Sequence, residues 1–208
     1  MLAPPTTNGP FERIIDPGSL HLKYERVEET DPEPFLRNDE FTSRYSDLGF
    51  EKCETIEETK IDGVPYTILA KCVGVAGYEL ELLEVDSRQS VNVVFPKGEK
   101  HELKFLKVVS PAFSNVGAKA EWRVTKNNGR VEPIALIVRL NVDKSVEDPE
   151  KGTVASYLTV SKLTSTSACV TDIVKPAPNQ NILARQLADS SRDRPCLPEY
   201  PWLPKGDL

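Results

Sequence analysis

The Asp62-Gly63 pair and the cysteines on either side of it constrain the fold of this 208-residue chain more than any other feature. Asp-Gly favours a two-residue type I′ turn, because both central residues of that turn need a positive φ. Across such a turn, Cys53 and Cys72 lie at equal distances from the centre and face each other. Directly opposed residues of antiparallel strands are close enough for a disulfide. We therefore predict a hairpin closed by a Cys53–Cys72 disulfide.

The remaining cysteines, Cys169 and Cys196, are then expected to pair with each other. None of the four has the C-x-x-C spacing that zinc or redox chemistry favours. Because disulfides persist in oxidising compartments, we expect a periplasmic or secreted protein. The alternative is a cytosolic protein with four reduced, buried thiols.

A second hairpin is predicted around Lys126-Asn-Asn-Gly-Arg130. A two-residue Asn-Gly turn would mix apolar and polar residues on each face of the strands. A three-residue loop that ends in a left-handed glycine would instead pair Trp122 with Ile134 and Ala120 with Leu136. The apolar pattern favours this bulged loop.

Alternating apolar residues recur through the middle of the chain and predict eight or nine strands. The alternating residues are Tyr78, Leu80 and Leu82, then Val91, Val93 and Phe95, then Leu103 and Phe105, and then Ile134, Leu136, Val138 and Leu140; residues 154–163 and 169–174 complete the series. Closely spaced strands are typical of a mostly antiparallel barrel or sandwich. We predict one helix, from about Pro178 to Ser190, with an apolar stripe of Ile182, Leu183 and Leu187.

Prolines concentrate at the two ends and divide the chain into three parts. Residues 1–40 are expected to form an extended arm with one edge strand around Leu20 to Tyr24, and residues 41–194 the folded domain. In residues 195–208 a proline at every third position predicts polyproline II, with Leu197, Tyr200 and Leu203 on one edge. That edge is expected to contact either this domain or a partner, so the arms are candidate contacts to another protein or to a second copy of the chain.

The net charge of −6 argues against a dedicated nucleic-acid-binding protein, whose phosphate contacts need clustered Lys and Arg. Most of this charge lies in residues 1–40, and the rest of the chain is nearly neutral. No run of 18 apolar residues occurs, so we expect no transmembrane helix.

Motifs for catalysis and cofactors are absent from the sequence. The two histidines, His21 and His101, have no nearby metal-ligand spacing, and neither G-x-S-x-G nor a phosphate-binding glycine loop occurs. We therefore predict no enzyme activity, no cofactor and no metal site. The remaining enzymatic alternative is a hydrolase that uses carboxylates alone, such as a glycosidase.

Several segments resemble a family of small exported proteins found chiefly in alphaproteobacteria. Residues 113–123 resemble its F-N-x-x-G-x-K-x-E-W-R stretch, residues 178–189 its C-terminal helix, and residues 45–53 and 72–78 its opening block. The resemblance covers roughly residues 45–196 and implies export and the same cysteine pairing. The family has no assigned activity, so it implies no catalytic residues.

We expect a non-catalytic binding or structural protein that acts through its surface. One alternative is an inhibitor of a cell-wall-cleaving enzyme. In that case residues 114–118 would form a protruding loop that contacts the enzyme. The predicted contact residues are a charged strip on the strands and the end of the chain: Lys119, Glu121, Arg123, Arg139, Tyr200 and Trp202.

Overall fold

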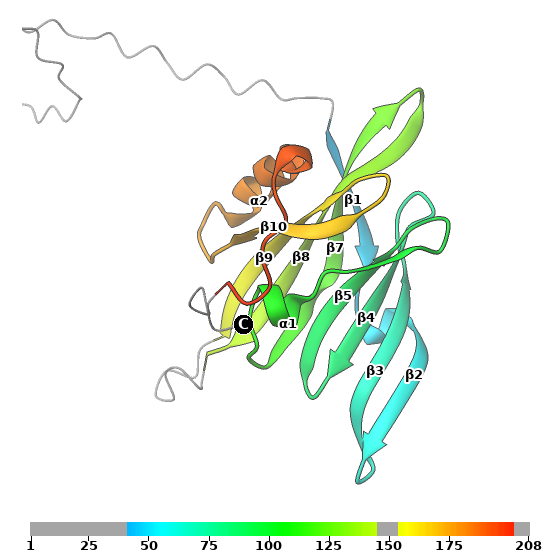
Figure 1. Cartoon of the computed structure of the whole chain (residues 1–208), viewed down its shortest axis with the longest axis vertical. Helices are drawn as coiled ribbons and strands as arrows, with labels where there is room; N and C mark the ends of the chain where they lie inside the picture. Colours follow the sequence, from blue (N-terminus) through cyan, green and yellow to red (C-terminus); the bar gives the residue numbers. More distant parts are fainter. Residues whose placement is uncertain (1–40, 145–153, 202–208) are drawn as a thin grey trace, which may run out of the picture. The chain divides into compact units, whose positions relative to one another are not determined.

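A computed structural model describes residues 41–144 and 154–201 of the chain, and in this part the fold is mainly β (Figure 1). The N-terminal arm, with its predicted edge strand, and Trp202 lie outside the described residues. The strands are β1 (Thr42–Asp47), β2 (Glu54–Ile61), β3 (Val64–Val73), β4 (Glu79–Val85), β5 (Arg88–Val94), β6 (Lys100–Glu102), β7 (Ser114–Asn127), β8 (Arg130–Asp143), β9 (Val154–Leu163) and β10 (Ala168–Val174). The helices are α1 (Phe105–Val108) and α2 (Gln180–Asp189), with 3-10 turns η1 (Phe50–Lys52) and η2 (Ser191–Asp193).

The strands form one curled sheet in the order β10-β9-β8-β7-β5-β4-β3-β2, with β1 beside β7 and β6 beside β5. Every pairing is antiparallel except β5 with β7, which share only the Arg88 and Ser114 pair. The predicted antiparallel β class is confirmed, but the sheet is a half-barrel and not the closed barrel or sandwich we expected. The ladder is interrupted because β1 takes most of the edge of β7 that β5 would need for continuous pairing.

The first hairpin confirms the predicted disulfide and shows why the register survives over its length. Asp62 and Gly63 have φ values of 52° and 80°, as a type I′ turn requires. One extra residue on β3, Tyr66, is followed by one extra residue on β2, Ile56, and the two shifts cancel. Cys53 and Cys72 therefore still face each other, with 4.5 Å between their Cα atoms.

The second hairpin corrects our predicted loop. The turn has two residues, Asn128 and Gly129, both with positive φ, and not three. The extra residue lies further from the turn, where the register shifts at Ile134 because Pro133 offers no N–H to the ladder. Trp122 consequently pairs with Leu136 and not with Ile134. This bulge separates the faces that an unbroken two-residue hairpin would have mixed.

Residues 103–105 form no strand, contrary to our prediction. β6 ends at Glu102, and Lys104 adopts a left-handed conformation with a φ of 53° before α1 begins. Leu103 and Phe105 are both fully buried. An extended strand would have placed both side chains on one buried face. The turn at Lys104 buries both of them as well.

The larger core fills the inner side of the curled sheet and centres on Trp122, which is completely buried. The indole N–H donates a hydrogen bond to the hydroxyl of Ser46 at 2.9 Å, and Tyr78 packs 5.9 Å from the indole ring. A Cβ at Gly74 would lie 2.9 Å from the indole, so no larger residue fits there without movement. A second core lies between the other side of the sheet and α2.

The end of the described chain is fastened to the domain. Cys169 of β10 and Cys196 form the second predicted disulfide, with 5.7 Å between their Cα atoms. The amide of Leu197 donates to the carbonyl of Val170, and its side chain packs on the larger core. Tyr200 has a φ of 55°, so the predicted polyproline II conformation is not continuous through residue 200. Among the described residues, no helix is long and apolar enough to cross a membrane.

Candidate functional site

Helix α2 packs on the sheet through two alanines and Leu187, so the predicted apolar stripe is right for Leu187 and wrong for Ile182 and Leu183. Ala184 and Ala188 are fully buried, whereas the side chains of Ile182 and Leu183 are exposed. The small residues let the helix approach the sheet closely, and longer polar side chains on its flank reach the strands. The prediction was wrong for Ile182 and Leu183 because it assumed that the largest apolar residues are the buried ones.

Three polar residues of α2 at four-residue intervals contact three predicted site residues. We call this arrangement the charged ladder. Its three rungs are Asn181 with Arg139, Arg185 with Glu121, and Asp189 with Arg123. The sequence analysis identified the strand residues but missed their partners on the helix. The i, i+4, i+8 spacing of Asn181, Arg185 and Asp189 is the signal that identifies one helix face.

The Arg123 rung is an interior ion pair. The guanidinium donates from Nε and Nη2 to the two carboxylate oxygens of Asp189 at 2.7 and 2.8 Å, and from Nη1 to the hydroxyl of Ser43 at 2.6 Å. Only 9% of the Arg123 side chain is exposed. The charge of Arg123 is thus used inside the domain, where it joins β1, β7 and α2.

The Glu121 rung is a half-buried ion pair. Arg185 donates from Nε to Oε1 of Glu121 at 2.6 Å and from Nη2 to Oε2 at 3.2 Å, while the hydroxyl of Ser43 donates to Oε1 at 2.5 Å. Burial by itself would raise the pKa of Glu121, but the hydrogen bonds from Arg185 and Ser43 outweigh it and lower the pKa overall. Glu121 is therefore a charged anchor for α2.

The third rung lies at a bulge in β7. Gly117, Ala118 and Lys119 together face a single residue of β8, Arg139. A Cβ at Gly117 would lie only 2.9 Å from the Cβ of Arg139, so glycine makes room for this arginine. The carbonyl of Ala118 accepts a hydrogen bond from the amide of Leu48, which holds the bulge in place.

Arg139 differs from the other two ladder arginines because its partners are neutral. It donates to the hydroxyl of Ser156 at 2.7 Å and to the side-chain oxygens of Gln180 and Asn181 at 3.3 and 3.2 Å. Among the described residues no carboxylate pairs with it. Lys119, by contrast, donates to Asp47 at 2.6 Å, and this contact lowers the pKa of Asp47.

A cavity of about 160 Å³ lies between α2 and the sheet at this end of the ladder. Arg139 and Lys119 are the cations of its lining, and Lys119 is paired with Asp47. Ile137 and Leu158, which are 4% and 5% exposed, supply a little apolar surface. The predicted strip therefore divides into two parts. Arg123 serves the interior, and Lys119, Glu121 and Arg139 reach the cavity.

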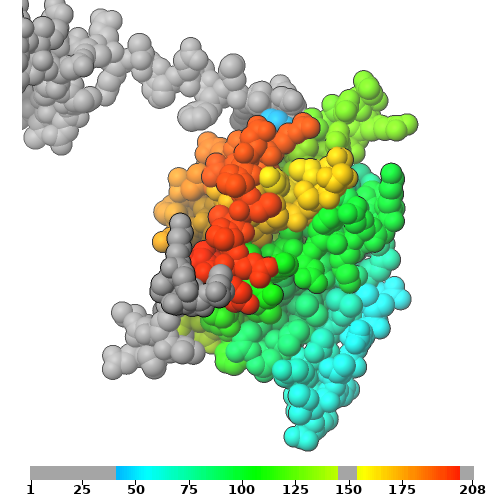
Figure 2. Space-filling view, in the orientation of Figure 1, coloured from blue at the N-terminus to red at the C-terminus, as the bar shows by residue number. Residues whose placement is uncertain are grey.

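The first hairpin is a second candidate surface, which the sequence analysis did not select. All residues of β2 are exposed, and among the strands of residues 41–144 and 154–201 β2 pairs only with β3. The hairpin tip extends past β4, whose pairing with β3 begins at Thr67 (Figure 1). Near the tip, Ile61, Val64 and Tyr66 are exposed. In the space-filling view the hairpin, in cyan, projects from the body of the domain (Figure 2).

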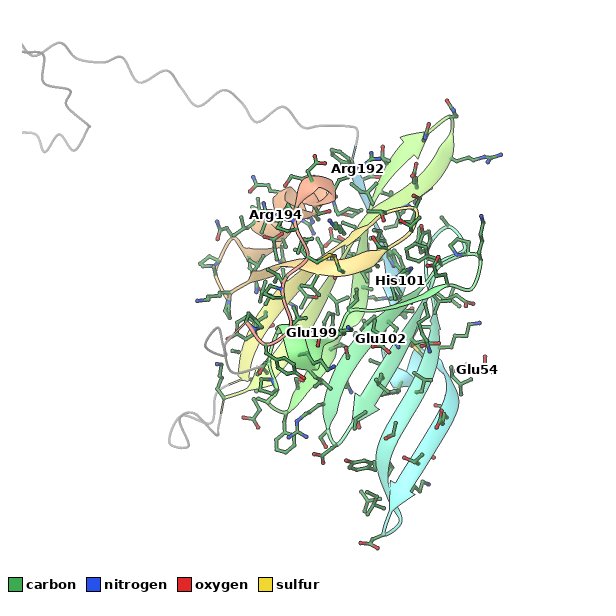
Figure 3. All side chains as sticks on the ribbon, in the orientation of Figure 1. Glu54, His101, Glu102, Arg192, Arg194 and Glu199 are labelled. Atoms are coloured by element: carbon green, nitrogen blue, oxygen red, sulfur yellow. A yellow bond between two sulfur atoms is a disulfide. The ribbon has the colours of Figure 1, made fainter. Side chains whose placement is uncertain are left out.

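The predicted contact residue Tyr200 lies against this domain's own surface. Its amide donates to the carbonyl of Lys107 in α1 at 2.6 Å. The neighbouring Glu199 accepts from Lys104 at 2.5 Å and lies 3.4 Å from Lys107, and Figure 3 shows it next to α1. The pKa of Glu199 is lowered by these two lysines. The segment before Trp202 thus fastens the chain to α1.

Three features of the described residues bear on the enzymatic and inhibitory alternatives, which stay untested. The carboxylates there whose pKa is shifted, Asp47, Glu121 and Glu199, all have a lowered pKa, whereas a glycosidase acid needs a raised one. In this same part of the chain no cluster of three metal-ligating side chains occurs. Residues 114–118 belong to β7 and form no protruding loop.

No model of a known protein family matches this chain, and no curated protein or solved structure is significantly similar to it. The resemblance to small exported proteins stays a prediction.

Proposed function

We propose that this chain is an exported, non-catalytic protein-binding domain. An extended segment of the partner would pair with the open edge of β2 as an additional strand of the hairpin β2–β3. Export is supported by two disulfides with no free cysteine among the described residues, since such bonds persist outside the reducing cytosol. The resemblance to a family of small exported proteins agrees with this location.

The observation that carries the binding function is the open edge of β2. A strand that pairs on one side only leaves backbone N–H and C=O groups free to pair with another chain. Natural edge strands are blunted by being short, charged, bulged or covered. β2 carries charges and one bulge at Ile56, but it has eight residues and all of them are exposed. The first disulfide fixes the base of the hairpin and keeps this edge in an extended conformation.

The side chains of the hairpin indicate the chemistry of the partner. Acidic residues outnumber basic ones from residue 51 to residue 62. The acids are Glu51, Glu54, Glu57, Glu58 and Asp62, and the bases are Lys52 and Lys60. Figure 3 shows Glu54 at the outer edge of the hairpin. A second copy of the chain would bring the same acids to this edge and repel it. A basic extended segment with apolar residues for Ile61 and Val64 fits better.

The test compares hairpin variants of the full, oxidised chain. Ile61→Ser with Val64→Ser should abolish capture of a partner from a native envelope extract. Val154→Ser is the matched control, because Val154 is equally exposed but lies at the start of β9. Hydrogen exchange on the captured complex should show slowed exchange of the β2 amides. Capture that survives the hairpin change, or protection confined to other strands, would refute the proposal.

A further inference from the structure

The charged ladder is incomplete at the rung beside the cavity. Each of the other two rungs is an arginine–carboxylate ion pair within the domain: Arg123 with Asp189, and Arg185 with Glu121. At the third rung α2 supplies the amide of Asn181 in the place where an aspartate would neutralise Arg139. Within the described part of the chain, the hydrogen-bond partners of the Arg139 guanidinium are therefore all neutral.

The hydrogen-bonding capacity of Arg139 is also partly unused. A guanidinium has five N–H groups, and three hydrogen bonds from Nη1 and Nη2 are made within the described part of the chain. Nε has no acceptor among the described residues. Nε and Nη2 together are the edge of an arginine that binds a carboxylate through two parallel hydrogen bonds.

The surroundings hold this guanidinium in place for a ligand. Gln180, which is buried, donates to the carbonyls of Ser156 and Val174 at 2.7 and 3.0 Å, and this fixes the side-chain oxygen that Arg139 contacts. Gly117 gives the arginine its room at the bulge. A preorganised cation loses little freedom when an anion binds.

We infer that this cavity binds a carboxylate carried on a short, branched apolar group. Arg139 would pair with the carboxylate, and the apolar group would lie over Ile137 and Leu158, which line the cavity and are 4% and 5% exposed. Lys119 also lines the cavity, but its charge is shared with Asp47. The negative charge of Glu121 in the lining is already compensated by Arg185. Inorganic phosphate fits less well, because it would leave the apolar part of the lining against a hydrated anion.

A free organic acid and the carboxyl terminus of a peptide present the same chemical group. The probes are isovalerate and a short N-acetylated peptide that ends in valine, each compared with its neutral amide, together with inorganic phosphate. Titrations of the full chain are followed by the NMR signals of the arginine Nε–H groups. We expect a saturable shift of the Arg139 signal by the carboxylates, with a Kd of about 1 mM for isovalerate, and none by the amides.

Tighter binding of the peptide would support a chain terminus as the source of the carboxylate, and tighter binding of isovalerate a free acid. Equal binding of the neutral amides, preferential binding of phosphate, or shifts confined to other arginines would overturn the inference.

Two variants test the role of the incomplete rung. Asn181→Asp supplies the missing carboxylate from the helix itself and should weaken isovalerate binding about tenfold or more, without loss of thermal stability. The matched control is Asn179→Asp, which adds the same charge at the exposed start of α2, outside the cavity lining, and should bind as the unchanged chain does. Equal affinities of the two variants would overturn the assignment, because a general charge effect would then explain any change.

Discussion

Replacing Asp189 by Asn tests whether the charged ladder holds α2 on the sheet. The change keeps the shape of the side chain but removes the charge that compensates Arg123, whose side chain is only 9% exposed. Removing one partner of a buried ion pair costs about 3–5 kcal/mol. Asp189 is itself 27% exposed, and Ser43 still accepts from Arg123, so water and the hydroxyl recover part of this cost. We expect a loss of about 2–3 kcal/mol of unfolding free energy, or about 4–12 °C in Tm for a domain of this size.

The assay is urea and thermal unfolding of the oxidised full chain. Asp193→Asn, a neighbouring exposed aspartate in η2, is the matched control and should change stability by no more than about 0.5 kcal/mol. Combining Asp189→Asn with Arg123→Met should cost less than the sum of the single changes by at least about 1 kcal/mol, because the pair is lost only once. A loss equal to that of the control, or strictly additive changes, would refute the reasoning.

Three further changes test other parts of the structure. Because Glu121 has a folded-state pKa below its ordinary value of 4.5, its charge stabilises the fold above that pH. In urea titrations the stability difference between the unchanged chain and Glu121→Gln should be constant near neutral pH and shrink as the pH falls below 4.5. A difference that grows in acid would contradict this. Gly117→Ala should lower the free energy of unfolding, measured by urea titration, by about 1–3 kcal/mol, since its Cβ collides with that of Arg139. An unchanged free energy of unfolding would contradict this and mean that the bulge can relax. Replacing both Cys53 and Cys72 by Ser should cost about 3 kcal/mol in the same assay, and the prediction fails if the loss is negligible.

The features that the sequence predicted correctly are local or depend on a turn. The Asp62-Gly63 turn fixes where its two strands meet, so the Cys53–Cys72 pairing follows from counting residues. The pairing survives two bulges only because they cancel, which counting does not reveal. The position of α2 was also predicted, since helix periodicity and a preceding proline are local signals.

Features that depend on distant contacts were not predicted correctly. Whether a curled sheet closes depends on which strands share the edges of β7, and the capture of most of one edge by β1 involves residues about 75 positions apart. The second hairpin failed for a similar reason, because Pro133 moves the bulge away from the turn. The buried face of α2 was predicted only in part: Leu187 packs on the second core, but close approach to the sheet favours alanines at the most buried positions, and only the docked position shows that distance.

The charged strip on the strands has a geometric explanation that changes its meaning. Glu121 and Arg123 are two residues apart on β7, a rise of about 6.8 Å, while Arg185 and Asp189 are four apart on α2, a rise of about 6 Å. A helix that runs along the strand can therefore pair with both residues at once, and the structure shows both pairs. An alternation of charges on a strand that looks like a binding face thus pairs with the docked helix in this structure. By this argument only the rung at which the helix withholds a carboxylate, Asn181 with Arg139, leaves charge for a ligand.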